Sequence, residues 1–412
     1  MLNPQSVDIR RVVFSLSDAL DLVGVDDVLH GKRVGMMAAH LAALLGEDEA
    51  QVAEIYDAGL LHDCGVSSTR VHRCLVDSLD WQGSFDHCQR GYDLLRECSL
   101  LAHLSDYVLL HHWHWNVSLP VSPKAPSPKI RQMANLLFLV DRVDALAAEH
   151  HAERKLLHAR ASIRQRILEQ RGVMFDPVLV DLFLDVSAAE AFWLQMDAAN
   201  VQYDLMDRAM QPAHRSVEWF QLRELALFFA RIVDAKSPFT VEHSEGVGRL
   251  AAYLGKVAGL DAAACDRLEL AGLLHDIGKL RIPDEILEKQ GSLDEREREI
   301  MMSHSFETYQ ILKRTPGLAQ IAELAAFHHE RLNGHGYPFH TNAAKITPEM
   351  RIIQVADVFQ ALAQRRPYRA PMAIPQILAE LRHMVADDSL DPVIFALVES
   401  DAERCHQLAV SA

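Results

Sequence analysis

The chain has 412 residues, of which 49% are hydrophobic and 24% charged, and a formal net charge of −16. This length suits two or three globular domains, and the acidic balance disfavours duplex nucleic acid as a partner because phosphate neutralisation supplies most of that affinity. No apolar run is long enough to span a membrane, the opening MLNPQSVDIRRVVF lacks a signal-peptide core, and the six cysteines form no C-x-x-C pair. We therefore expect a cytoplasmic protein with reduced thiols and no membrane partner.

Histidine and aspartate recur along the first half of the chain. A His-Asp pair lies within GLLHDCG at 59–65, and further histidines and aspartates follow in HCQRGYDLL, LVDRVDAL and MFDPVLVDLF. In chain order, the set comprises His30, His62, Asp63, His87, His111, His112 and Asp141. A single histidine on a helix is more often a surface or core residue than a ligand, so the order of the set matters more than any member.

The remaining sequence predicts helices. The segment 194–233 has helix-forming composition interrupted at Pro212, which indicates helical connectors or the opening of a second domain's first helix. Apolar residues recur at three- and four-residue spacing in 250–260, 267–277 and 321–330. No run alternates over the length of a strand. The chain is therefore predicted to be all-α.

The second half repeats the pattern of the first. GLLHDIG at 272–278 matches GLLHDCG at 59–65, and equivalent positions are offset by 213 to 217 residues (275 − 62 = 213; 304 − 87 = 217). The second set comprises His243, His275, Asp276, His304, His328, His329 and Asp357. Seven matched positions in one order indicate a tandem duplication, with predicted domains at 1–200 and 215–412. His304 has the thinnest local context of the second set.

The repeated residue types suit a metal centre. Successive helical residues point about 100° apart, so His275 and Asp276 do not easily serve one ion in the same manner, whereas the two oxygens of Asp276 can bridge two ions. Imidazole and carboxylate ligands without thiolate suit iron, manganese, nickel or zinc. Two such ions about 3.5–4 Å apart support phosphoester cleavage by a bound hydroxide.

The second half resembles the HD-GYP group of HD-domain phosphohydrolases. The resemblance is carried by TVEHS (240–244), HDIGK (275–279), His304, HHE (328–330), NGHGYP (333–338), VADVFQAL (355–362) and RRPYR (365–369). It implies an all-helical HD-type domain, and together with the duplication it predicts two tandem domains of this type joined by helical connectors. It also implies hydrolysis of cyclic di-GMP to linear pGpG, with further cleavage to GMP left open, by a hydroxide on two or three ions that are often iron or manganese.

The resemblance also implies roles for single residues. The seven His and Asp residues of the second set become metal ligands, with Asp276 bridging and catalytic. Lys279 becomes a phosphate contact or an aid to the leaving oxygen, and Tyr337, Arg366 and Arg369 become substrate contacts. The alternatives are a solvated charge for Lys279, a turn aromatic for Tyr337 and a basic surface run for the two arginines.

Three positions depart from the family pattern. Phe239 stands where some relatives place a glutamate that binds a third ion, so we expect two ions in the second half. Gln360 replaces a frequent aspartate, which predicts reduced or altered activity if that carboxylate orients water. Asn333 replaces another frequent aspartate, with a minor effect on the turn.

The first half keeps the metal-ligand pattern but lacks the substrate contacts. Asp26 lies four residues before His30 and is a further candidate ligand. Val66 replaces the lysine, no GYP follows the double histidine, and His150 and Glu153 replace the two arginines. A regulatory module with a second metal site, a second hydrolase and a structural relic remain open, and regulation is favoured.

Three functions are compatible with the sequence. The leading hypothesis is a cyclic dinucleotide phosphodiesterase, with cyclic di-GMP or mixed cyclic GMP-AMP as substrate. The others are a largely non-catalytic nucleotide-binding signalling module and a mononucleotide phosphohydrolase. The connecting helices are candidates for homodimer pairing, and an input signal enters through the first half or a separate signalling partner.

Overall fold

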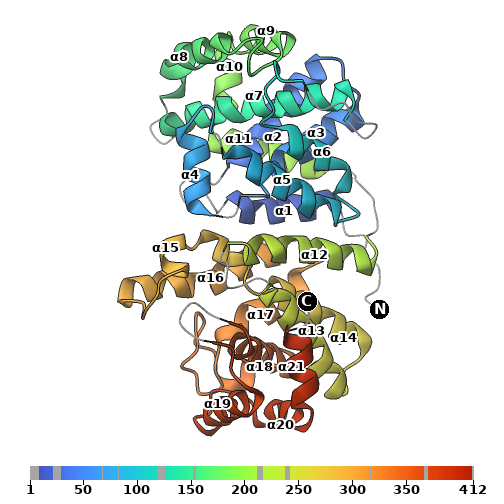
Figure 1. Ribbon diagram of the computed structural model, residues 1–412, viewed down its shortest axis with the longest axis vertical. Helices are drawn as coiled ribbons and strands as arrows, with labels where there is room; N and C mark the ends of the chain where they lie inside the picture. Colours follow the sequence, from blue (N-terminus) through green and yellow to red (C-terminus); the bar gives the residue numbers. More distant parts are fainter. Residues whose placement is uncertain are drawn as a thin grey trace. The chain divides into compact units, whose positions relative to one another are not determined.

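The computed structural model describes residues 9–21, 29–66, 68–81, 83–118, 126–151, 155–210, 217–236, 242–315, 317–365 and 370–410. Contacts between Cα atoms divide the chain into two compact units, Leu20–Ala213 and His214–Ala412 together with Met1–Ala19. Helices dominate both units (Figure 1), and the one β feature in the described ranges is an isolated bridge between Arg171 and Phe175. The all-α prediction is confirmed.

The N-terminal unit is organised around its longest helix, α7 (Pro128–His151). Residues 136–140 of this helix, LLFLV, have no exposed surface because neighbouring helices cover them on every side. Figure 1 shows α7 among the other helices of the unit. These are α2 (His30–Leu44), α3 (Glu49–Leu61), α4 (Thr69–Asp77), α5 (Ser84–Arg96), η2 (Ala102–Leu104), α6 (Ser105–Leu110), α8 (Leu156–Glu169), α9 (Pro177–Val186), α10 (Glu190–Leu194) and α11 (Ala198–Met210). Most of α1 (Ile9–Asp21) is grouped with the C-terminal unit instead.

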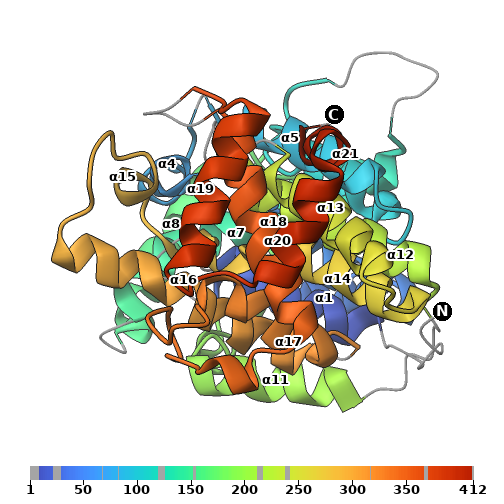
Figure 2. The ribbon, with the colours of Figure 1, turned by 90° about the horizontal axis from the view of Figure 1, so that it is seen from below.

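The C-terminal unit is organised around α18 (Pro348–Ala363), which begins with a proline in its first turn and a Thr347 side chain that accepts a hydrogen bond from the Met350 amide. Figure 2 shows α13, α19, α20 and α21 around α18, and all four contact it. The helices are α12 (Trp219–Asp234), α13 (His243–Val257), α14 (Ala262–Leu274), η3 (Ile277–Arg281), α15 (Asp284–Leu287), α16 (Glu295–Arg314), α17 (Ala319–Ala326), η4 (Phe327–His329), η5 (Ala343–Lys345), α19 (Ile374–Ala386), α20 (Pro392–Ser400) and α21 (Ala402–Val410).

The first glycine of the repeated heptapeptide allows two helices to approach closely. A Cβ atom on Gly272 of α14 would lie 2.6 Å from the Gly248 Cα of α13. A Cβ atom on Gly59 of α3 would lie 2.5 Å from the Gly35 Cα of α2. Both distances are shorter than van der Waals contact, so each pair of helices meets at glycine.

The last glycine of the heptapeptide serves a second close approach. A Cβ on Gly278 would lie 2.1 Å from the His304 carbonyl oxygen, and one on Gly65 would lie 1.9 Å from that of His87. The His-Asp pair therefore sits directly against the helix that supplies the next histidine of its set. The heptapeptide thus encodes a packing arrangement as well as two polar side chains.

Other expectations can be checked against the described residues. The connector forms α11 and α12, and Pro212 lies outside the described ranges. All six cysteines are free thiols. No helix in the described part of the chain is both long and apolar enough to cross a bilayer.

Candidate metal centres

The structure brings the seven residues of the second set together at the ends and faces of five helical elements. His243 opens α13, His275 and Asp276 follow α14, His304 lies in α16, His328 and His329 belong to η4, and Asp357 lies in α18. All are buried except His329, which is partly exposed. The cluster is therefore assembled from segments spread over more than one hundred residues of sequence.

Asp276 lies between two pairs of histidines. Its Oδ2 is 3.5 Å from His243 Nε2 and 3.3 Å from His275 Nε2. Its Oδ1 is 3.5 Å from His304 Nε2 and 3.7 Å from His328 Nε2. The two Nε2 atoms within each pair are 3.2 Å apart. One oxygen of a single carboxylate thus faces each pair, which is the arrangement of a bridging ligand.

Asp357 is the second carboxylate of the cluster. Its Oδ1 is 3.4 Å from His243 Nε2 and 3.8 Å from His275 Nε2. Its Oδ2 is 3.9 Å from His329 Nδ1. Asp357 therefore lies between His329 and the pair formed by His243 and His275.

Hydrogen bonds from Nδ1 orient the histidines. In three of them Nδ1 lies 2.5–2.7 Å from the backbone carbonyl three residues earlier: His275 on Gly272, His304 on Met301 and His328 on Ala325. In His243 the Nδ1 atom contacts Gln360 Oε1 instead. A donating Nδ1–H leaves the Nε2 lone pair for a metal ion, and each of these Nε2 atoms faces the centre. Gln360 is thus a positioning partner for a histidine, a role that the sequence did not indicate.

The electrostatics of the cluster fit divalent ions. Burial lowers the pKa of His304 to about 4 and that of His328 well below its usual value, so both imidazoles are neutral near pH 7. Burial would raise the pKa of Asp276, but His275 and Lys279 hold it well below its usual range. Asp276 Oδ1 is buried without a hydrogen-bond donor. An orphaned carboxylate oxygen among neutral imidazole nitrogens indicates a site built for cations.

Two predicted substrate contacts lie beside this centre. Lys279 is partly buried, and its Nζ contacts Asp276 Oδ2, which does not fit a solvated surface charge. The ring of Tyr337 lies 4.7 Å from that of His329 between centroids, and its amide donates to the His329 carbonyl at 3.2 Å. Burial raises the pKa of the Tyr337 hydroxyl, which keeps it protonated. Phe239, Arg366, Arg369, Glu153 and Asp26 lie outside the described residues.

Glu330 holds the loop that carries Tyr337. Its side chain is fully buried, with Oε1 accepting from the Phe339 amide and Oε2 from the Thr341 amide, both at 2.7 Å. The loop also packs against Glu330 at Gly336, where a Cβ would lie 2.4 Å from the Glu330 Cα. Glu330 follows the double histidine directly in the sequence, but no motif or spacing indicates this role for it.

The first set forms a second cluster with the same plan. Asp63 Oδ2 lies 3.8 Å from His30 Nε2 and 3.5 Å from His62 Nε2, while its Oδ1 lies 3.3 Å from His87 Nε2 and 4.0 Å from His111 Nε2. The Nε2 atoms are 3.3 Å apart in the first pair and 3.2 Å apart in the second. The duplication therefore extends from sequence to the geometry of the site.

The second carboxylate of the N-terminal cluster is also in place. Asp141 Oδ1 lies 3.4 Å from His30 Nε2 and 3.9 Å from His62 Nε2. Its Oδ2 lies 3.7 Å from His112 Nε2, a buried nitrogen without a hydrogen-bond partner. All seven residues of the first set thus lie within one cluster.

Arginines distinguish the N-terminal cluster from its C-terminal counterpart. Arg142 places Nη2 2.9 Å and Nε 3.1 Å from Asp141 Oδ2. Asp144, at the position of Gln360, accepts from Arg33 at 2.6 and 3.0 Å and from His30 Nδ1 at 2.8 Å. Asp141 and Asp144 therefore each accept hydrogen bonds from an arginine guanidinium, which the sequence pattern does not indicate.

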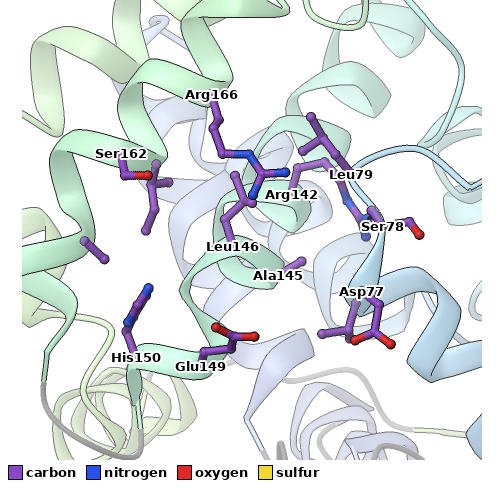
Figure 3. Close-up of a pocket in the computed structure, with 13 residues that line it drawn as sticks. Asp77, Ser78, Leu79, Arg142, Ala145, Leu146, Glu149, His150, Ser162 and Arg166 are labelled. Atoms are coloured by element: carbon purple, nitrogen blue, oxygen red, sulfur yellow. Dashed lines mark hydrogen bonds between the residues drawn. The ribbon is translucent and has the colours of Figure 1, made fainter.

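A cavity of about 440 Å³ adjoins Arg142 in the N-terminal unit, where α4, α7 and α8 supply its walls. Arg142, Arg166, Glu149 and His150 are among the side chains drawn around it in Figure 3. His150 is the residue that aligns with Arg366 of the second half. The N-terminal unit thus has a polar cavity close to its own cluster, lined by residues that differ from those expected around the C-terminal centre.

Comparison with known proteins identifies the family. The HD domain family matches residues 29–149 and 228–394. The 3′3′-cGAMP-specific phosphodiesterase 1 of Vibrio cholerae is 35% identical over 98% of this chain and 94% of its own length. The chain belongs to the HD-GYP phosphodiesterases. This HD-GYP protein is therefore a phosphoric diester hydrolase with tandem HD domains.

Further relatives cover different shares of this HD-GYP protein. The 3′3′-cGAMP-specific phosphodiesterase 3 of V. cholerae is 34% identical over 76% of the chain and 66% of its own length. A cyclic di-GMP phosphodiesterase of Thermotoga maritima is 36% identical over 40% of the chain and 45% of its own length. A crystal structure of a V. cholerae cyclic GMP-AMP-specific phosphodiesterase matches with a TM-score of 0.63 and 26% identity, covering 95% of this chain and 97% of that one. The likeness to this structure therefore includes both halves.

Proposed function

We propose that this HD-GYP protein hydrolyses a cyclic dinucleotide in its C-terminal half, with mixed cyclic GMP-AMP as the first substrate to test. The observation that carries the proposal is Asp276, whose two oxygens each face one histidine pair. The choice of substrate is supported by the relative named for 3′3′-cGAMP, which aligns over 98% of this chain. Cyclic di-GMP is the second candidate, because the cyclic di-GMP phosphodiesterase of T. maritima is 36% identical over 40% of the chain.

The proposed cofactor is a pair of divalent ions, iron or manganese, held by the second set of seven residues. When bound, such a pair supplies a nucleophile derived from water and stabilises charge on the phosphoryl oxygens. The two carboxylates balance much of the positive charge of the pair in a buried site. The backbone hydrogen bonds of His275, His304 and His328 fix their rings in the ligating orientation before substrate arrives.

The other side chains of the site have proposed roles at the phosphodiester. Lys279 is held beside Asp276 and provides a fixed cation for a phosphate oxygen or for the ribose 3′ oxygen as it leaves. Tyr337, whose ring lies tilted beside that of His329, forms a wall that orients the nucleotide. Departure of the 3′ oxygen opens the ring to a linear dinucleotide with a 5′ phosphate.

The duplication supplies a matched test of this proposal. We would measure turnover of mixed cyclic GMP-AMP and of cyclic di-GMP by anaerobically purified protein with iron or manganese, beside the variants Asp276→Ala and Asp63→Ala. We expect Asp276→Ala to abolish hydrolysis and Asp63→Ala to retain it. Equal turnover by the wild type and Asp276→Ala would overturn the proposal, and comparison of the two substrates decides between the candidates.

We propose that the N-terminal half is regulatory. Val66 stands at the position of Lys279 and is buried, so it offers no charge to a phosphate. Arg142 engages Asp141, whereas the equivalent of Arg142 in the second half is Val358. The cavity beside Arg142 offers room for a small ligand. We expect His62→Ala to change turnover at the C-terminal centre, with or without added nucleotide, and an unchanged turnover in both conditions would remove this proposal.

A further inference from the structure

A thiol lies in the N-terminal cluster where the C-terminal cluster has a hydroxyl. Cys88 follows His87 in α5 and is fully buried, with its Sγ 3.8 Å from His87 Nε2. The equivalent residue in the second half is Ser305, whose Oγ lies 3.2 Å from His304 Nε2. In both halves, the residue after this histidine therefore places a side-chain heteroatom near its Nε2. That atom is the sulfur of Cys88 in the N-terminal half and the oxygen of Ser305 in the C-terminal half.

Cys88 adds a sulfur donor beside a group of three other donor atoms: its Sγ lies 3.8 Å from His87 Nε2 and 3.6 Å from His111 Nδ1, and its thiol donates to the Ser84 carbonyl at 3.3 Å. His87 Nε2 lies 3.2 Å from His111 Nε2 and 3.3 Å from Asp63 Oδ1, and Asp63 Oδ1 lies 4.0 Å from His111 Nε2. His87, Cys88 and His111 can all direct ligand atoms at one ion. Tetrahedral zinc, with bonds of about 2.0–2.1 Å to nitrogen and about 2.3 Å to sulfur, separates its donors by roughly 3.3–3.6 Å. The separations among the nitrogen and oxygen donors, 3.2–4.0 Å, surround these values, and the Cys88 Sγ lies slightly farther than the tetrahedral separation from His87 Nε2, at 3.8 Å.

The charges of the cluster favour a single divalent ion. Asp141 is paired with Arg142, and Asp144 is paired with Arg33. Among the described residues of the cluster, the acidic groups that remain are Asp63 and the Cys88 thiol, which as carboxylate and thiolate together balance one doubly charged ion. A second ion on the Asp141 side would share its carboxylate with a buried guanidinium, which opposes binding.

We propose that the N-terminal half holds one thiophilic divalent ion of the zinc class, ligated by Asp63, His87, Cys88 and His111. This centre differs from the two-ion, thiolate-free centre proposed for the C-terminal half in metal, in ligands and in number of ions. Thiolate ligands select softer ions such as zinc over manganese. The proposal does not depend on the substrate or on turnover.

Cobalt substitution of the full-length protein tests the thiolate ligand. Tetrahedral Co²⁺ occupies zinc sites, and a cysteine ligand gives a sulfur-to-cobalt charge-transfer band in the near ultraviolet. We expect this band in the wild type, its loss in Cys88→Ser, and its retention in Cys98→Ser, a control at another buried cysteine. Absence of the band in the wild type, or its survival in Cys88→Ser, would overturn the proposal.

Zinc content and a converse variant make the test decisive. Elemental analysis should find one equivalent less zinc in Cys88→Ser than in the wild type, whereas equal contents contradict the proposal. Adding Ser305→Cys to Cys88→Ser should restore a band from the C-terminal centre, which verifies that the assay detects a thiol at this position. If Cys88→Ser does not fold, serine variants of the other five cysteines assign the ligand, because all five should keep the band.

Discussion

Replacing Glu330 with glutamine should loosen the loop that carries Tyr337. The fully buried Glu330 carboxylate accepts one hydrogen bond on each oxygen, from the amides of Phe339 and Thr341, both at 2.7 Å. Glutamine keeps the volume but presents an NH₂ group to one of these N–H groups. A hydrogen bond to a charged group contributes about 1.5–3 kcal/mol, so Glu330→Gln should lower the free energy of unfolding by about 2 kcal/mol.

This loss predicts two measurable effects. For a unit of this size, about 2 kcal/mol corresponds to a fall in melting temperature of about 4–8 °C. If the loss falls mainly on the loop, KM for the cyclic dinucleotide should rise by up to about 30-fold with a smaller change in kcat, since 1.36 kcal/mol is a factor of ten. Thermal melts and steady-state kinetics check both effects.

A matched control separates the contact from the charge change. Glu323 lies exposed on α17 of the same unit, and Glu323→Gln makes the same chemical change at the surface. Its free energy of unfolding should stay within about 0.5 kcal/mol of the wild type. A melting temperature of Glu330→Gln within about 1 °C of the wild type, together with an unchanged KM, would refute the assigned role of Glu330.

Three further substitutions test single contacts. Lys279→Met should lower kcat by about 10²–10³-fold with unchanged metal content, because it removes a fixed cation beside the phosphate; a kcat near that of the wild type would exclude this role. Gln360→Leu removes the acceptor for His243 Nδ1 and should weaken metal affinity by about 10–100-fold in a metal titration, whereas unchanged affinity would contradict the positioning role. Burial lowers the pKa of Lys236 from 10.5 to about 8, so the unfolded state binds more protons than the folded state between these two pH values. The free energy of unfolding of the wild type should therefore rise with pH across this window relative to that of Lys236→Met. Chemical denaturation at several pH values checks this, and a difference in free energy of unfolding between the two proteins that stays constant with pH would contradict it.

The two ligand sets and the helical fold followed from local patterns. Apolar spacing of three and four residues defines helices because side chains at that spacing share one face. The same His and Asp types in the same order, at offsets of 213 to 217, indicated a duplicated site. Each ligand occupies a fixed position on its helix. When the same helices recur in the same order, the ligands therefore come together again in a second site. Residue types alone indicated that Asp276 can bridge two ions and that such ions support phosphoester cleavage, whereas the resemblance supplied the cyclic dinucleotide substrate and the roles of Lys279 and Tyr337.

Contacts between distant segments were decided only by the tertiary structure. Gln360 is 117 residues from the histidine that it orients. The two amides that donate to Glu330 belong to a loop, and hydrophobic periodicity does not predict the conformation of a loop. Arg142 is adjacent to Asp141, yet its pairing depends on the carbonyls of Leu75 and Ser78 that hold its guanidinium. Cys88 likewise carries no signal of a ligand in the sequence, because no C-x-x-C pair includes it. The role of such a side chain depends on the groups that it contacts in the folded protein. Those groups belong to other segments of the chain, and sequence spacing does not predict which of these segments pack together.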